Sequence, residues 1–374
     1  MDFIYFDSAA TAVPLKTATD AAISAMGVVG NPSSVHKAGL SAKKIIDNAR
    51  KSVANALYCK PDEIIFTSGG SESNNQALYG LAKLRARRSK RIITTDSEHP
   101  SINNPLSNLA ENGYEIIKIG TKNGVLDIDG LKNALKDGAA FVSVMLVNNE
   151  TGAKYDIAAV RREIDRSGCG ALLHCDAVQG FLKTETAREI TKNCDLASIS
   201  AHKIGGIKGV GALFVKNGVK IAPFVCGGGQ ENGLRSGTEN VSGIAAFGAA
   251  CESYVVESAH IKELYDDLVN RLRESDADFK LNIPENHVNT ILSLSVVGAR
   301  SEVILNALSA EGICISAGSA CSARKGHSTT LTAFGLTKEE IEGTVRISIG
   351  THNTKEEIAF LAEKLAETAK RLRR

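Results

Sequence analysis

The sequence predicts an α/β fold with one open, mainly parallel sheet of seven strands, helices on both faces of that sheet, and a second, smaller α+β domain. Two observations support this prediction. Between about residues 60 and 215, short apolar runs alternate with longer stretches of helical periodicity, which is typical of a parallel sheet covered on both sides. The 374 residues, of which 43% are hydrophobic, are enough to build a full-sized core.

Each of the seven predicted strands is a short apolar run. The runs cover residues 63–67, 91–95, 114–118, 140–146, 171–175, 195–199 and 211–215. No helical pattern separates the last two runs, so we expect an antiparallel strand there. Ligands of open α/β sheets bind beyond the carboxyl ends of the strands. Asp176 directly follows the fifth run and is therefore a candidate ligand-binding residue.

A long helical pattern over residues 241–273 ends the sheet region. The apolar runs that follow, at residues 287–296, 312–316 and 344–349, predict the smaller α+β unit. Residues 1–14 are too few to fold alone and are expected to join it. We predict a large domain of residues 15–257 and a small domain of residues 1–14 and 258–374. A capping box at Thr354 predicts the start of the last helix.

The composition favours a small-molecule ligand. The 44 Lys and Arg residues against 42 Asp and Glu leave a net charge of +2, too small to predict a nucleic-acid or membrane partner, and no apolar run reaches the roughly 20 residues of a membrane span. The eight cysteines are too sparse for a disulfide framework, and no apolar signal segment precedes Asp7, so we expect a cytoplasmic protein. Cys169, His174 and Cys175 lack strong zinc-ligand spacing, and we predict no metal site.

Lys203 lies in a group of residues that meets the requirements of pyridoxal 5'-phosphate (PLP). The lysine can form the Schiff base, Asp176 can keep the pyridine nitrogen protonated, and Ser200 and His202 can donate to the phosphate. The glycine-rich turn at residues 67–72 precedes a helical pattern and offers backbone N–H groups to a phosphate. Each feature alone is common as a solvated lysine, a helix cap or a tight turn. Together they predict PLP, because a different residue meets each need of the cofactor.

Further motifs follow in order along nearly the whole chain. They are residues 5–11 (YFDSAAT), 30–36 (GNPSSVH), 97–100 (SEHP), 147–152 (VNNETG), 227–231 (GGGQE), 235–238 (RSGT) and 319–321 (SAC). With these motifs and the two cofactor segments, the chain resembles the cysteine desulfurases of the NifS/IscS type, in the class V aminotransferase group of fold-type I PLP-dependent transferases. The resemblance implies a PLP enzyme that acts on L-cysteine, forms a homodimer and passes sulfur to an acceptor protein.

The resemblance also implies roles for individual residues. His99 is expected to stack on the pyridoxal ring and to move protons, and Arg346 to clamp the substrate carboxylate with its planar fork. Asn149 and Gln179 are expected to hydrogen-bond the phenolic oxygen of the ring and to orient the substrate. The residues expected at the phosphate are Gly70, Ser71, Ser200 and His202, together with Thr238 from the second subunit.

Cys321 is predicted to be the nucleophile that accepts sulfur. It lies in a small, polar and basic stretch, residues 319–327, without helical or strand periodicity, and basic neighbours favour the thiolate. In the expected cycle, the amine of L-cysteine displaces Lys203, which then moves a proton from the substrate. Cys321 attacks the substrate sulfur, which leaves alanine and a persulfide on Cys321.

Two departures from the family pattern limit the prediction. Residues 324–327 (RKGH) replace the leucine, glutamate and proline that many relatives carry after the cysteine, and Thr351 replaces a second arginine. The first change leaves the sulfur acceptor, in iron–sulfur cluster assembly or in tRNA or cofactor thiolation, not predicted, and the second bears on substrate affinity. The alternative hypotheses are a selenocysteine lyase, another class V activity such as transamination, and an inactive scaffold. An aminotransferase needs no nucleophile at Cys321, and the intact Lys203 and Asp176 argue against the scaffold.

Overall fold

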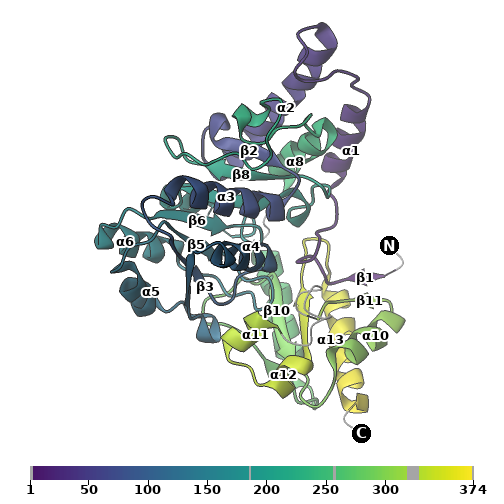
Figure 1. Cartoon of the computed structure of the whole chain (residues 1–374). Helices are drawn as coiled ribbons and strands as arrows, with labels where there is room; N and C mark the ends of the chain where they lie inside the picture. Colours follow the sequence, from purple (N-terminus) through teal and green to yellow (C-terminus); the bar gives the residue numbers. More distant parts are fainter. Residues whose placement is uncertain (1–2, 185–186, 256–257, 318–327, 373–374) are drawn as a thin grey trace.

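The computed structural model describes residues 3–184, 187–255, 258–317 and 328–372 (Figure 1). Its main sheet has seven strands in the order β2-β8-β7-β6-β5-β3-β4. They are β2 (Ile64–Thr67), β3 (Arg91–Thr95), β4 (Glu115–Ile119), β5 (Phe141–Met145), β6 (Leu172–Asp176), β7 (Leu196–Ser200) and β8 (Gly211–Val215). Every predicted run forms a strand of this sheet. The predicted antiparallel strand is β8, which is antiparallel to both β7 and β2, whereas the other pairs are parallel.

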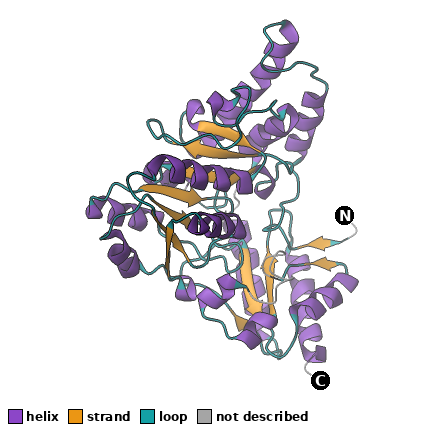
Figure 2. Ribbon diagram, viewed as in Figure 1, coloured by secondary structure: helices purple, strands orange, loops and turns teal. Residues whose placement is uncertain are grey.

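Helices cover both faces of this sheet, as Figure 2 shows. Successive residues of a strand point to opposite faces. Ile64 and Phe66 therefore join one apolar cluster, while Ile65 between them joins another. The first cluster lies under α1 (Lys16–Met26), α2 (Lys37–Leu57), α5 (Ile128–Leu135), α6 (Ile157–Ser167), α7 (Ala187–Asn193) and α8 (Val241–Ser253). The second lies under α3 (Gly70–Arg85) and α4 (Pro100–Glu111).

The single helix predicted over residues 241–273 is wrong. Two helices occupy this region, α8 and α9 (Ser258–Glu274). The chain leaves α8 at Tyr254, whose φ of −72° and ψ of 109° are extended and cannot continue a helix. The apolar periodicity runs on past this point because both helices bury one face, α8 against the main sheet and α9 against a separate core.

The second unit is built on a three-stranded antiparallel sheet in the order β12-β10-β9. The strands are β9 (Lys280–Leu281), β10 (Ile291–Ser295) and β12 (Thr344–Ser348), and the helices of this part of the chain are α9, α10 (Ser301–Ala310), α11 (Thr329–Phe334), α12 (Lys338–Glu342) and α13 (Lys355–Leu372). The predicted capping box is present before α13, since Thr354 and Glu357 bond each other's backbone N–H groups. The placement of domain boundaries at residues 14 and 257 stays a prediction.

The start of the chain is tied to the second unit. Strand β1 (Ile4–Tyr5) pairs in parallel with β11 (Ile313–Cys314), and Asp7 forms a bridge with Ser348 at the end of β12. Beyond this bridge the N-terminal segment continues toward the main sheet, where the backbone N–H of Ala12 donates to the carbonyl of His202. Within the described ranges, none of the helices has the length and hydropathy required to cross a bilayer.

Candidate active site

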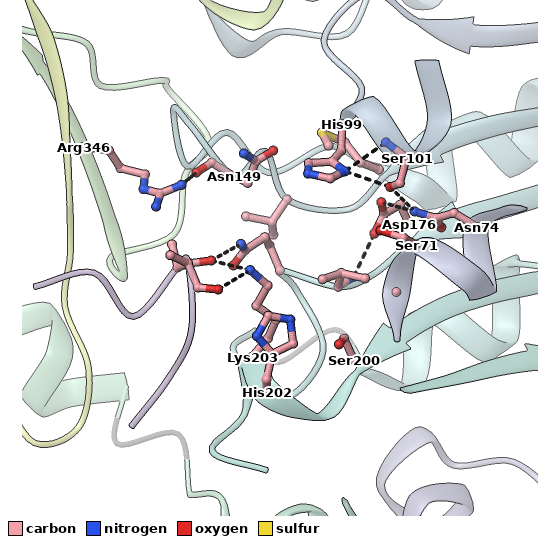
Figure 3. Close-up of a pocket in the computed structure, with 17 residues that line it drawn as sticks. Ser71, Asn74, His99, Ser101, Asn149, Asp176, Ser200, His202, Lys203 and Arg346 are labelled. Atoms are coloured by element: carbon pink, nitrogen blue, oxygen red, sulfur yellow. Dashed lines mark hydrogen bonds between the residues drawn. The ribbon is translucent and has the colours of Figure 1, made fainter. Parts of the chain in front are cut away.

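A cavity of about 310 Å³ lies beyond the carboxyl ends of β5, β6 and β7, next to the start of α3 (Figure 3). The structure brings ten of the predicted site residues to this cavity. They are Gly70, Ser71, His99, Asn149, Asp176, Gln179, Ser200, His202, Lys203 and Arg346. Of the two others, Thr238 is exposed and does not line the cavity, and Cys321 lies outside the residues that the structure describes.

Lys203 enters the cavity from the turn that follows β7. Its Nζ donates to the carbonyl oxygens of Ala9 (2.6 Å) and Ala10 (2.9 Å) on the N-terminal segment. Burial lowers the pKa of Lys203 to about 8, and the positive charge of Arg346 acts in the same direction, while Asp7 and Asp176 oppose it. An appreciable fraction of the lysine therefore carries a nucleophilic, uncharged amine near neutral pH.

Asp176 is the last residue of β6 and is only 5% exposed. Its carboxylate accepts from the backbone N–H of Val178 (3.0 Å) and from Nδ2 of Asn74 (2.8 Å). Asn74 lies four residues after Gly70 on α3 and so shares the helix face that meets the cavity. The two donors hold the carboxylate at the cavity wall, where it can face a protonated ring nitrogen.

His99 caps the start of α4. Its Nδ1 accepts from the backbone N–H of Ser101 (3.1 Å) and lies 2.8 Å from the Ser101 hydroxyl. Because a backbone N–H only donates, Nδ1 carries no proton and the neutral ring has its proton on Nε2. Burial lowers the pKa of His99, Lys203 lowers it further and Asp176 opposes the shift, so the ring is neutral near neutral pH.

Asn74 and Ser101 are site residues that the sequence analysis missed. Nδ2 of Asn74 also donates to Oγ of Ser101 (2.9 Å), which links Asp176 through Asn74 and Ser101 to His99 (Figure 3). Two signals could have found them. Asn74 follows Gly70 by one helical turn, and Ser101 lies in the first turn of the helix that His99 caps.

One end of the cavity has the features of an anion site. Helix α3 begins at Gly70, where backbone N–H groups lack helical partners and the helix dipole favours negative charge. A side chain at Gly70 would not fit, since its Cβ would lie 2.6 Å from Cγ2 of Val178. The Oγ of Ser200 is buried at the cavity and has no hydrogen-bond partner among the described residues. A phosphate at this end of the cavity would satisfy that hydroxyl.

His202 lies beside this anion site. Its Nδ1 is 3.1 Å from Oγ1 of Thr11. Burial lowers the pKa of His202 to about 4, and the positive charges of Lys203, Lys183 and Lys208 contribute. The ring is therefore neutral at physiological pH and keeps one N–H to donate.

Arg346 of β12 reaches the opposite end of the cavity from the second unit and is 3% exposed. Its Nη2 donates to Oδ1 of Asp7 (2.7 Å) and its Nη1 to the carbonyl of Asn149 (2.8 Å). The Nε is buried and has no hydrogen-bond partner among the residues that the structure describes. Because the side chain lines the cavity, its guanidinium is a candidate for binding a carboxylate there.

His174, weighed above as a zinc ligand, lies in the core of the sheet rather than at the cavity. Its ring nitrogens contact the hydroxyls of Ser143 (2.9 Å) and Ser198 (3.0 Å). Burial lowers the pKa of His174 to about 3, so the ring stays neutral. Its role is to join β5, β6 and β7 below the site.

The chain matches the family model of class V aminotransferases over residues 4–361. It is 36% identical to a cysteine desulfurase IscS of Dictyoglomus turgidum, with 99% of this chain and 95% of the relative covered, and 35% identical to cysteine desulfurase IscS 1 of Archaeoglobus fulgidus, with 99% and 97% covered. Among solved structures, a NifS-like protein superposes with a TM-score of 0.91 at 32% identity, covering 98% of this chain and 99% of that one.

A second solved structure, SspA in complex with cysteine, superposes with a TM-score of 0.83 at 30% identity and covers 94% of this chain and 100% of that one. The matches extend over both units of the structure. They include the segments that supply Lys203, Asp176 and Arg346 to the cavity. The chain therefore belongs to the class V aminotransferase family, in the branch of the NifS and IscS cysteine desulfurases.

Proposed function

We propose that this chain is a PLP-dependent cysteine desulfurase, which converts L-cysteine to L-alanine and takes the sulfur as a persulfide on Cys321. One observation carries the proposal. A single cavity joins an amine of lowered pKa at Lys203, a buried carboxylate at Asp176, an anion site at the start of α3 and the guanidinium of Arg346. These are the groups that PLP and an α-amino acid need together.

The residues around the cavity fit the cofactor. Lys203 would hold PLP through its ε-amine and Asp176 would hold the ring nitrogen, while the ring of His99 covers one face. The phosphate would take the N–H groups at Gly70 and Ser71, the free hydroxyl of Ser200 and an N–H of His202. Asn149 and Gln179 would reach the phenolic oxygen. When bound, the protonated ring draws electrons from the Cα of an attached amino acid.

The chain's own residues then carry the reaction. Arg346 would bind the substrate carboxylate through its guanidinium, and Lys203, released from the cofactor, removes the proton from Cα. The Cys321 thiolate attacks the substrate sulfur, so that an S–S bond forms while the Cβ–S bond breaks and its electron pair remains on the carbon skeleton. Protonation of that carbon yields alanine. One L-cysteine and one thiol thus give one alanine and one persulfide, with no external oxidant.

Assembly and partners are part of the proposal. Thr238 is exposed on the loop after Gly237, and a second copy of the chain could present it to the phosphate of the first. On this basis we propose that the chain forms a homodimer. We also propose a cytoplasmic location. The domain division at residues 14 and 257 would let Cys321 of the small domain approach the cavity and then carry sulfur to an acceptor protein.

The test is to incubate the purified protein with L-cysteine and a reductant and to measure alanine and sulfide together. Equal amounts of both are expected. Cys321→Ser should keep the yellow cofactor and lose persulfide formation, while Cys226→Ser, which removes an exposed cysteine elsewhere in the chain, should behave as wild type. Persulfide formation by Cys321→Ser would overturn the assignment, and pyruvate or glutamate-dependent products would indicate a different class V activity.

A further inference from the structure

Lys183 is a buried lysine with no place in the proposed reaction. It lies seven residues after Asp176, is 9% exposed, and its Nζ donates to Oε1 of Gln179 at 3.2 Å. It lines a second cavity of about 180 Å³, which shares Ala9 and Lys203 with the first. Lys183 therefore lies behind the wall that Ala9 and Gln179 form at the cofactor cavity.

The hydrogen bonds around Gln179 determine which way its amide faces. The protonated lysine Nζ only donates, so it takes Oε1, and the carbonyl of Ala9 only accepts, so it takes Nε2 at 2.7 Å. With this orientation Gln179 keeps one N–H for the cavity it lines. The same Ala9 carbonyl also receives the Lys203 amine, so the four groups form one network.

Burying the Lys183 amine is energetically costly for a residue with a purely structural role. Within the ranges that the structure describes, no carboxylate lies within ion-pair distance of Lys183. The charged groups that face Lys183 are Lys203 and Arg346, and the positive charge of Lys183 also lowers the pKa of His202. Burial lowers the pKa of Lys183 to about 7, with smaller contributions from these two positive charges. An apolar side chain of similar length would avoid that desolvation cost.

We infer that Lys183 is a positioning residue, which fixes the amide of Gln179 so that an N–H, and not the carbonyl oxygen, faces the phenolic oxygen of the cofactor. The inference rests on the proposed PLP binding but not on desulfuration. Without Lys183, only the bond to the Ala9 carbonyl holds the Gln179 amide in this orientation. The amide is then less firmly fixed against presenting its oxygen to an oxygen that itself accepts, which weakens cofactor binding.

The test measures PLP binding by the apo-protein, followed by fluorescence, and the pH midpoint of the visible absorption change of the loaded protein. Lys183→Met should raise the PLP dissociation constant about tenfold, which corresponds to about 1.4 kcal/mol. It should also shift the midpoint upward, because a donor and a positive charge that both favour the deprotonated phenolic oxygen are lost. A residue that only fills space would leave this midpoint unchanged.

Two controls separate this role from others. Lys208→Met removes an exposed positive charge that also acts on His202. Its PLP dissociation constant should stay within twofold of the wild-type value, and its pH midpoint should be unchanged. In a Gln179→Leu background, Lys183→Met should change the PLP dissociation constant less than twofold, because the amide it orients is gone. If the Met variant does not fold, Lys183→Ala, which leaves room for water beside the second cavity, is expected to show the same loss.

Either of two results overturns the inference. One is that Lys183→Met binds PLP and titrates as Lys208→Met does. The other is that its effect persists in full in the Gln179→Leu background. Neither readout uses L-cysteine, so the two proposals can fail separately. A wild-type protein that binds PLP but releases no alanine would refute the proposed function. The role of Lys183 would still be decided by PLP binding and the pH midpoint.

Discussion

Replacing Asn74 with alanine is expected to weaken PLP binding about 10- to 100-fold. Asn74 supplies one of the two donors to the buried carboxylate of Asp176, at 2.8 Å. A hydrogen bond to a charged group contributes about 1.5–3 kcal/mol, and about 1.4 kcal/mol corresponds to a factor of ten. With one donor lost, the carboxylate is less well held against the ring nitrogen of the cofactor.

The assay is reconstitution of the apo-protein with PLP, followed by fluorescence. Asn75→Ala is the matched control, because Asn75 lies next on the same helix and, within the described part of the chain, its side chain bonds only the carbonyl of Ser71. A dissociation constant for Asn74→Ala within twofold of the Asn75→Ala value would refute the reasoning. A double-mutant cycle with Ser101→Ala should show a coupling energy, since Asn74 also bonds the Ser101 hydroxyl.

Three further outcomes are expected. Covalent capture of PLP by the apo-protein should accelerate with pH to a plateau above about 8, the lowered pKa of Lys203; in stopped-flow absorbance, a rate still rising at pH 10 would contradict this. Burial raises the pKa of Glu98 to about 8, so this carboxyl binds a proton more tightly in the folded protein than in the unfolded chain. The protonated group therefore stabilises the folded protein at low pH, and this stabilisation is lost as the pH rises from about 4.5 through 8. Calorimetry should therefore show a smaller fall of Tm from pH 5 to pH 8 in Glu98→Gln than in wild type, and equal falls would exclude this role. Arg346→Lys should raise the KM for L-cysteine about 10- to 100-fold through loss of the planar fork, and a KM close to the wild-type value would show that the carboxylate binds elsewhere.

The sequence predicted the strands of the main sheet well because their signal is local. Runs such as Ile64–Thr67 are apolar, β-branched and bounded by turns, and a strand buried on both faces needs little more. The break at Tyr254 was missed because apolar periodicity reports which face of a helix is buried but not whether one core or two cores bury it. The turn geometry there depends on where the second unit lies.

Only some of the residues at the cavity were predicted from the sequence, for a similar reason. Lys203 and Asp176 could be recognised from residue type and position, and the anion site from its glycines. Asn74, Ser101 and Lys183 are ordinary residues in their local sequence, and only the fold brings them to charged or polar partners. Arg346 was predicted through the family resemblance alone. Its hydrogen bond to Asp7, 339 positions away, appears only in the fold.

The contacts of the N-terminal segment form at different stages of protein synthesis. Ala9 and Ala10, which are synthesised long before Lys203, supply the carbonyls that hold it. Strand β1, earlier in the same segment, can pair with β11 only after Cys314 has been synthesised, and Asp7 can contact Arg346 and Ser348 only later still. The seven-stranded sheet is complete at Val215 and can fold earlier during synthesis. Nascent chains of this protein will therefore carry a folded sheet before the contacts of β1 and Asp7, in the segment that holds Lys203, have formed.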